Sequence, residues 1–326
     1  MTTTGELLDR PSAVRLQPAY DDPEQVLSVI RGVDPFWAIV KYAASDTETK
    51  ALAGDGRRAV FVPPWFRRDF ALHGEALVPG ADVILDNPRF VDAAREVFGP
   101  DALVVPTTVY VNVMVPGPVP FIAHTDVPAF RGFTRDEHPL WLLIQMHQSG
   151  LFEEHRIKLA TAVSWFYDGP GGEFHYWPDG PDAPNATIAT PYDNIAVVAD
   201  NERTYHGVAP VGTDEPVIAG LTPDTLLHRV DGGWEMATDG QAVHRATDAE
   251  VRITVSWKGE IYADEADRRR ALDHTDDIDL DHVVSTLVAD MRARGVDVEV
   301  PDDPHHDEAW VAAVSSTYGR RPPQPA

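Results

Sequence analysis

The residues best placed for chemistry are a histidine and an aspartate two positions apart, His124 and Asp126, in the segment FIAHTDVPAF (121–130). Side chains on an extended chain alternate with a period of two, so both groups face the same side and can bind one metal ion. A second histidine from elsewhere would complete a two-histidine, one-carboxylate triad. Such a triad leaves open coordination positions and suits non-haem Fe(II) and O2.

Two further pairs share this spacing, His274 with Asp276 and His305 with Asp307, so their context has to separate them. His274 lies in an acidic stretch between two predicted helices. His305 lies near the C-terminus, with no predicted strand after it. Both pairs are therefore predicted to be solvated surface residues. His124, in contrast, precedes a long β-rich region that contains several more histidines.

The third metal ligand has to come from the histidines that follow His124. We select His206, which lies 82 residues further on. The sequence 189–211 around it predicts a strand, a turn and a second strand, which would return the chain to the same end of a sandwich. His175 is the main alternative. The predicted metal ligands are thus His124, Asp126 and His206.

Composition excludes several classes of protein. The chain has 326 residues and no cysteine, which excludes disulfide scaffolds, Cys-ligated zinc, iron–sulfur clusters and Cys nucleophiles. Its net charge of −25 repels phosphate backbones and anionic lipids, so we expect neither nucleic-acid nor membrane partners. This charge favours solubility or steering of a cationic substrate. The sequence shows no signal-peptide pattern or membrane-spanning run, so we expect a cytoplasmic protein.

Residues 1–102 are predicted to support the rest of a single domain that spans 1–326. Residues 1–20 resemble an irregular leader. A helix begins at Asp22 and Pro23, and its apolar positions continue to Trp37. Further along, we expect a polar loop over 45–58, a short strand over 59–65 and a second helix over 88–98.

Residues 103–260 have the pattern of a β-sandwich or barrel. Over 103–115, β-branched residues alternate with Tyr110, Asn112 and Met114, which face the opposite side. Short strands bounded by Gly, Pro and Asp then recur. We expect strands over 157–167, 173–177, 187–190, 194–199, 205–211 and 252–258, and a hairpin over 234–246. Helices are expected over 140–147, 264–272, 281–294 and 307–318, the last three in a C-terminal segment 261–326.

The order of four segments resembles the Fe(II)/2-oxoglutarate-dependent oxygenases over about residues 105–260. The segments are HTD (124–126), WFYDGPGGEF (165–174), PYDNIAVVADNERTYHGVAPV (191–211) and RITVSW (252–257). The resemblance implies a mainly β, α+β fold with a double-stranded β-helix (a jelly-roll, cupin-like core) between N-terminal and C-terminal helices. It also implies that His124, Asp126 and His206 hold Fe(II).

In that family an arginine after the distal histidine binds the far carboxylate of 2-oxoglutarate, and a hydroxyl residue two positions on assists. Arg252 and Thr254 match this pattern. A guanidinium presents a planar fork that suits a carboxylate. Asn112 or Tyr110, on the strand that leads to His124, could reach the same co-substrate.

The spacing between His206 and Arg252 departs from the family, because 46 residues separate them where ten to fifteen are usual. An insertion that contains the 234–246 hairpin would explain the difference, since a longer surface loop costs little closure entropy. Arg229 and Arg245 are the alternatives to Arg252.

The resemblance implies hydroxylation of a small molecule, such as an amino acid or a secondary metabolite, with O2 consumed and 2-oxoglutarate converted to succinate and CO2. Asp126 argues against the halogenating branch of the family, which has a small residue at that position. No separate acid or base is needed. Phe130 and Arg131 are expected to line the substrate pocket. The sequence does not indicate an oligomeric state.

Two other classes stay open. A cupin-like metal enzyme, either an isomerase or a dioxygenase that attacks its substrate directly, would keep the metal ligands and not need Arg252. A non-catalytic β-sandwich binding protein would need neither the metal ligands nor Arg252.

Overall fold

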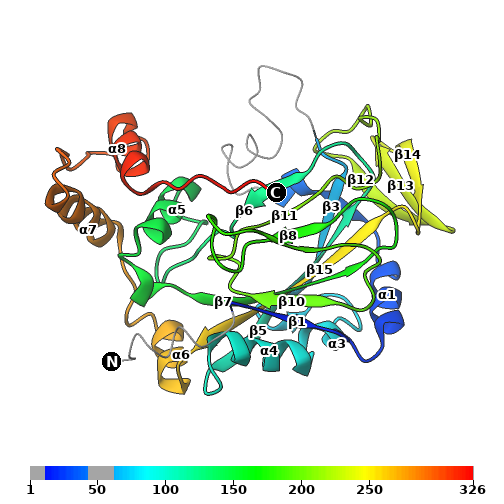
Figure 1. Ribbon diagram of the computed structural model, residues 1–326, viewed down its shortest axis with the longest axis horizontal. Coiled ribbons are helices and arrows are strands. Elements are labelled where there is room, and N and C mark those ends of the chain that lie inside the picture. Colours follow the sequence, from blue (N-terminus) through cyan, green and yellow to red (C-terminus); the bar gives the residue numbers. More distant parts are fainter. Residues whose placement is uncertain (1–11, 43–61, 326) are drawn as a thin grey trace. The chain divides into compact units, whose positions relative to one another are not determined.

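A computed structural model describes residues 12–42 and 62–325 of the chain. They fall into two compact units (Figure 1). Unit 1 comprises the residues up to Thr125, Leu159–Ile261 and those from Pro323 onward; unit 2 comprises Asp126–Lys158 and Tyr262–Pro322. The single domain over 1–326, with its divisions at 102 and 260, stays a prediction.

Unit 1 is built on eight strands in two antiparallel sheets, and the chain crosses repeatedly from one sheet to the other. They are β5 (Leu103–Met114), β6 (Phe121–His124), β7 (Lys158–Phe166), β8 (Phe174–Tyr176), β9 (Ala186–Ile188), β10 (Ala196–Ala199), β11 (His206–Val208) and β15 (Arg252–Tyr262). The large sheet contains β10, β7, β15 and β5 as neighbours, and the small sheet has the order β6-β11-β8-β9. These two strand orders are those of a double-stranded β-helix, so the predicted fold class is confirmed.

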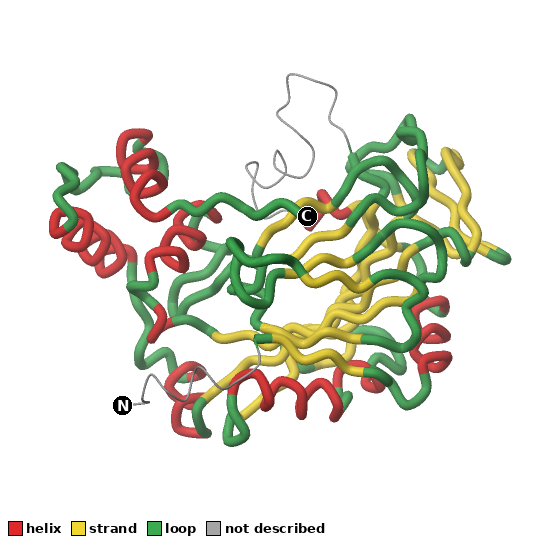
Figure 2. Tube along the Cα trace, viewed as in Figure 1, coloured by secondary structure: helices red, strands yellow, loops and turns green. Residues whose placement is uncertain are grey.

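The N-terminal residues extend the large sheet at both ends. The elements are β1 (Ala13–Leu16), α1 (Pro23–Arg31), β2 (Phe36–Ala38), β3 (Trp65–Leu72), β4 (Glu75–Ala76), α3 (Asp82–Leu85) and α4 (Pro88–Phe98). β1 pairs with β10, whereas β3 and β2 continue the sheet beyond β5. The helices lie along the face of the large sheet that points away from the small sheet (Figure 2). Phe90 of α4 packs there against Trp257, with ring centroids 5.7 Å apart.

Three N-terminal predictions need correction. The leader predicted over 1–20 contains strand β1, which is short and pairs only with the distant β10, so no local pattern marks it. The helix that begins after Asp22 ends at Arg31, because Gly32 and the pre-proline position Asp34 disfavour helix; Phe36–Ala38 forms a strand instead. Of the strand predicted over 59–65, residues 59–61 lie outside the described residues and β3 begins only at Trp65. The loop predicted over 45–58 also lies outside them.

The predicted insertion between His206 and Arg252 forms a three-stranded extension of the large sheet. It consists of β12 (Leu226–Val230), which the sequence did not reveal, and the expected hairpin of β13 (Gly233–Thr238) and β14 (Gln241–Thr247). β12 pairs with β2. Trp234 is fully buried against Phe36, with ring centroids 5.6 Å apart. The insertion is therefore folded and adds to the core of unit 1.

Unit 2 is mainly helical and has its own apolar core. Its helices are α5 (Leu140–Ser149), α6 (Glu265–Leu272), α7 (Leu280–Ala293) and α8 (Glu308–Tyr318), close to the predicted ranges. Asp264, Asp279 and Asp307 cap the last three by accepting a backbone N–H in the first turn. Within the described ranges, no helix is long and apolar enough to cross a membrane.

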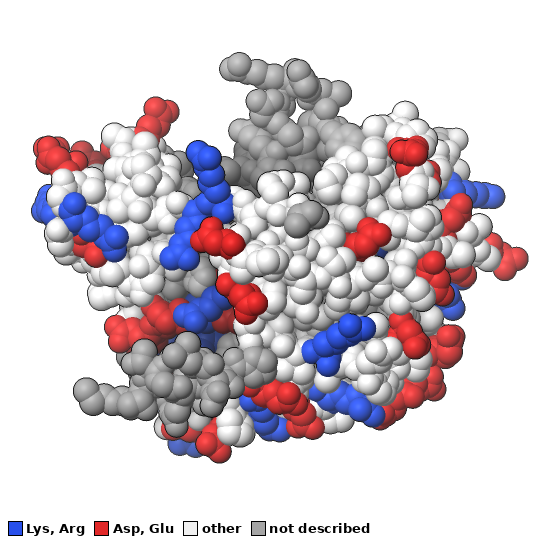
Figure 3. Space-filling model, in the orientation of Figure 1, with Lys and Arg blue, Asp and Glu red and all other residues white. Residues whose placement is uncertain are grey.

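The face of the molecule drawn in Figure 3 carries charged side chains of both signs. On the face drawn in Figure 3, acidic side chains alternate with isolated basic ones over the part of the chain that the structure describes. This face has no continuous basic surface of the kind that a phosphate backbone requires.

Candidate metal centre and buried arginine

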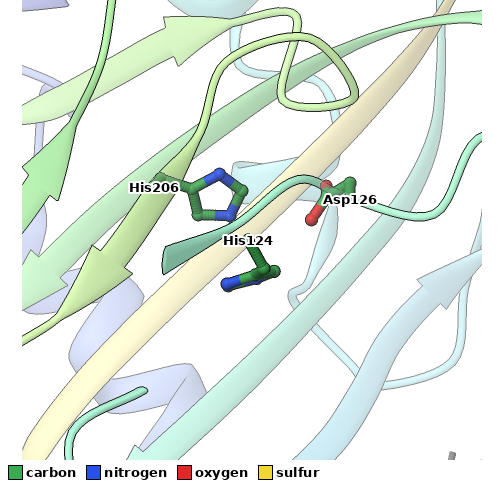
Figure 4. Close-up of side chains that lie close together, drawn as sticks. All are labelled: His124, Asp126 and His206. Atoms are coloured by element: carbon green, nitrogen blue, oxygen red, sulfur yellow. The ribbon is translucent and has the colours of Figure 1, made fainter. Parts of the chain in front are cut away.

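Three predicted metal ligands come together at the end of the small sheet. The Cα atoms of His124 on β6 and His206 on β11 are direct partners across the ladder. Their imidazole centroids lie 4.4 Å apart. One potential ligand atom from each of His124, Asp126 and His206 lies within 4.8 Å of the others, and the three side chains face one another (Figure 4).

Backbone hydrogen bonds orient both imidazoles. The Nδ1 atom of His124 lies 2.9 Å from the carbonyl oxygen of Ile122, and Nδ1 of His206 lies 3.0 Å from that of Thr204. A proton on Nδ1 in these bonds directs the Nε2 lone pair of each ring to the metal. Two neutral imidazoles and one carboxylate form a donor set that suits non-haem Fe(II). The residues therefore fit the predicted metal.

Gly207 permits the close approach of the two strands that carry the histidines. A Cβ atom at this position would lie 2.9 Å from the carbonyl oxygen of Phe121 and 3.1 Å from the backbone nitrogen of Ala123. The register between β11 and β6 also shifts between His206 and Val208. A side chain at position 207 would push β11 away from β6 and separate the histidines.

The alternative histidines lie elsewhere. His175 is the ladder partner of Gly207, and its Nδ1 atom lies 3.0 Å from Oγ1 of Thr187. His274 is exposed and pairs with Asp277 at 2.8 Å. In the third pair, His305 is only partly exposed, with its Nε2 atom 3.2 Å from Nδ1 of His138, and Asp307 caps α8, so these two residues are not simply solvated as predicted. Among the described residues, the group at His124 is the one set of three that could hold a metal ion.

Arg252 lies at the start of β15 and is 1% exposed. Its Nε donates to the carbonyl oxygen of Gly172 at 2.9 Å, and Nη1 donates to Oγ1 of Thr254 at 2.6 Å. Its Nη2 has no hydrogen-bond partner among the described residues. Burial lowers the pKa of the guanidinium from its ordinary value, and the nearby Tyr192 hydroxyl opposes this shift. A carboxylate would satisfy both the orphan donor and the buried charge.

The two alternative arginines already have carboxylate partners. Arg229 makes a two-point contact with Asp248, in which Nη2 and Oδ2 are 2.8 Å apart. Arg245 pairs with Glu235 at 2.5 Å, and 73% of its side chain is exposed. These contacts favour Arg252 over both.

Asn112 and Tyr110 lie on the inner face of β5, opposite Val109, Val111 and Val113, which are fully buried in the outer core. The Asn112 Oδ1 atom is buried without a hydrogen-bond partner among the described residues. The ring of Tyr110 lies beneath the Arg67 guanidinium, with Cζ 3.7 Å from the ring centroid. Asn112 therefore keeps a polar atom for a ligand, whereas Tyr110 already has a cation partner.

Sequence reasoning did not select Tyr192, which helps to position the arginine. Its hydroxyl donates to the Gly172 carbonyl oxygen at 2.6 Å, the same atom that accepts from Arg252. A Cβ atom at Gly172, which has a φ of +73°, would lie 2.9 Å from Cδ of Arg252. The Gly-Gly pair before β8 was the available signal; Tyr192 carried none.

Phe130 and Arg131 have structural contacts within unit 2. Phe130 is 1% exposed and packs against Phe152 in the core of this unit. Arg131 pairs with Asp267 at 2.6 Å and also with Asp276, and only 11% of its side chain is exposed. Their predicted role in substrate binding stays a prediction, and these contacts compete with it.

No family model matches the chain, and no curated protein matches it either. Three solved structures illustrate its structural likenesses. A 2OG-Fe(II) oxygenase family oxidoreductase from Burkholderia pseudomallei has 13% identity and a TM-score of 0.40, covering 76% of this chain and 85% of its own. The α-ketoglutarate-dependent epimerase SnoN from nogalamycin biosynthesis has 12% identity and a TM-score of 0.39, covering 78% and 80%. HygX from Streptomyces hygroscopicus, with nickel and 2-oxoglutarate bound, has 10% identity and a TM-score of 0.36, covering 80% and 87%.

These identities and TM-scores are too low to indicate a function, so a functional assignment depends on the residues of this chain. The double-stranded β-helix and its His-Asp-His group are the features in which the chain resembles the Fe(II)/2-oxoglutarate-dependent oxygenases.

Proposed function

We propose that the protein is a non-haem Fe(II)/2-oxoglutarate-dependent oxygenase that hydroxylates a small molecule, such as an amino acid or a secondary metabolite. The supporting observation is that one β-helix carries both a His-Asp-His group and a buried arginine whose Nη2 atom has no partner among the described residues. The first feature suits Fe(II), and the second suits a carboxylate ligand.

In this proposal His124, Asp126 and His206 hold Fe(II), and Arg252 with Thr254 binds the distal carboxylate of 2-oxoglutarate. When bound, the metal and co-substrate activate O2 for oxidation of a substrate C–H bond, and succinate and CO2 are released. The protein orients the imidazoles through Ile122 and Thr204, neutralises the co-substrate charge with Arg252 and excludes water from that charge by burial. No protein group has to transfer a proton.

The first test adds Fe(II) and then 2-oxoglutarate to metal-free protein without oxygen and records the visible spectrum. We expect a weak charge-transfer band only when both are present. His206→Ala should abolish the band, because Fe(II) affinity should fall by about 100-fold or more when a ligand is lost. His175→Ala is the matched control and should retain the band, since His175 lies outside the metal group. Substrates can then be screened by succinate formation.

Two results would contradict the proposal. Iron binding without a 2-oxoglutarate band would favour a cupin-like metal enzyme that acts without this co-substrate. Absence of iron binding would favour a non-catalytic β-sandwich binding protein.

A further inference from the structure

Trp165 lies on the inner face of β7, beside the strand that carries Arg252. Its side chain is 1% exposed, and its indole Nε1 atom has no hydrogen-bond partner among the described residues. The Arg252 Cζ atom lies 5.9 Å from the centroid of the Trp165 ring. Two neighbouring strands therefore present one buried, unpaired N–H donor each, on the same side of the sheet.

A buried donor without a partner destabilises the fold, so two of them on neighbouring strands indicate a ligand that accepts hydrogen bonds. A carboxylate has two oxygens and can accept from both. The positive charge of Arg252 also selects an anion. The unpaired Oδ1 atom of Asn112 on β5 is an acceptor and cannot donate to a carboxylate.

Aromatic neighbours hold the Trp165 ring in place. Its centroid lies 4.8 Å from that of Phe174 and 5.1 Å from that of Tyr192. Tyr192 in turn donates to the Gly172 carbonyl oxygen that accepts from Arg252. The indole and the guanidinium are thus fixed by one connected group, and neither donor has to reorganise before a ligand binds.

We propose that the indole N–H of Trp165 is a second donor to the distal carboxylate of 2-oxoglutarate, alongside Nη2 of Arg252. This inference rests on the proposed function and deepens it. It makes Trp165 a specificity-determining residue, because a 2-oxo acid without a distal carboxylate leaves both donors unpaired. Discrimination against such an acid then comes from two strands of the sheet and not from the arginine alone.

The test measures 2-oxoglutarate affinity of the Fe(II) protein without oxygen in Trp165→Phe, which keeps an aromatic ring and removes the donor. We expect the Kd to rise about 10- to 100-fold, the range for a lost hydrogen bond to a charged group, while Fe(II) affinity stays unchanged. Trp257→Phe is the matched control. Its indole lies on the outer face and donates to the Leu85 carbonyl oxygen at 2.8 Å, so its loss should leave the Kd unchanged.

A second ligand distinguishes a hydrogen bond from simple packing. The probe is 2-oxopentanoate, which has the 2-oxo acid end and no distal carboxylate. If Trp165 binds that carboxylate, Trp165→Phe should not weaken 2-oxopentanoate binding further. An equal loss for both ligands, or no loss for 2-oxoglutarate, would overturn the inference. Absence of 2-oxoglutarate binding by the unchanged protein would overturn the proposed function first.

The hydrogen bond from Trp165 can also be tested in the protein without a substitution, in case Trp165→Phe does not fold. With Zn(II) as a diamagnetic replacement, the assigned indole N–H resonance of Trp165 should move downfield on addition of 2-oxoglutarate and not of 2-oxopentanoate. An unmoved resonance with 2-oxoglutarate bound would contradict the proposed hydrogen bond.

Discussion

The two faces of the central strands β7, β15 and β5 differ in whether their buried polar groups have hydrogen-bond partners. On the outer face, the Trp257 indole donates to Leu85, and the Ser164 hydroxyl lies 2.7 Å from that of Tyr20. On the inner face, Trp165, Arg252 and Asn112 each keep one buried polar atom without a partner among the described residues.

The difference separates stability from ligand binding within the same strands. The outer face buries apolar side chains and pairs these hydroxyl and indole groups, which stabilises the fold. The inner face leaves polar groups unpaired at a cost in stability that a ligand could offset when it binds. Substitutions on the outer face should therefore change the free energy of unfolding, and those on the inner face should change ligand affinity.

The largest expected effect is on the outer face. Trp257→Ala should lower the free energy of unfolding by about 3–5 kcal/mol, because it leaves a cavity beside Phe90 and an unpaired Leu85 carbonyl. Denaturant unfolding measures the change in the free energy of unfolding. The 2-oxoglutarate Kd of the folded fraction should stay the same; a large rise in Kd would mean that the two faces are not independent.

Arg252→Met should have the opposite pattern. It should weaken 2-oxoglutarate binding by about 100-fold, since it removes a charged donor, while Fe(II) affinity is retained. The free energy of unfolding should not fall, because a buried charge with an orphan donor is replaced by an apolar side chain. Calorimetric titration and denaturant unfolding test both parts. Thr254→Val should have a smaller effect on 2-oxoglutarate binding. Unchanged affinity in Arg252→Met would exclude Arg252 as the residue that binds the carboxylate.

Gly207→Ala should act on the metal and leave the outer face unchanged. The added Cβ atom would approach the Phe121 carbonyl oxygen and separate β11 from β6. We expect Fe(II) affinity to fall about 10-fold, comparable to the loss of a group that orients a ligand. Metal titration measures the Fe(II) affinity. Gly240→Ala is the control for a general effect of glycine replacement, because Gly240 lies at a turn with open space around it. Equal metal affinities in all three proteins would contradict this role.

The smallest effect concerns the paired hydroxyls of the outer face. Ser164→Ala leaves the buried Tyr20 hydroxyl unpaired and should lower the free energy of unfolding by about 1 kcal/mol. The double variant Tyr20→Phe/Ser164→Ala should recover most of this loss. A double variant that is less stable than Ser164→Ala would show that the hydroxyls do not act as a pair.

The sequence predicted the elements that carry strong local patterns. The alternation in β5, the cap and proline of α1 and α4, and the β15 run are visible without the structure. The order of the motifs selected His124, Asp126, His206 and Arg252 as candidate site residues. These four positions depend on residue type and spacing, which a sequence displays directly.

Long-range contacts could not be predicted in this way. Strand β1 exists because it pairs with β10, and β12 because it pairs with β2 and β13. The position of Tyr192 depends on a hydrogen bond to Gly172, which lies 20 residues earlier in the chain. The acidic partners of Arg131 are more than 130 residues away. None of these contacts leaves a periodic signal near the residue concerned.

Strand β15 lies between β7 and β5, although it is the last strand of unit 1 along the chain. The two earlier strands therefore cannot become part of one continuous sheet until residues 252–262 are available. During synthesis, residues 252–262 must emerge before the large sheet can close. Such late, long-range pairing is typical of slow folding. The contacts around Arg252 should be among the last features to form, and a chain that stops before β15 should remain open to proteases along β7 and β5.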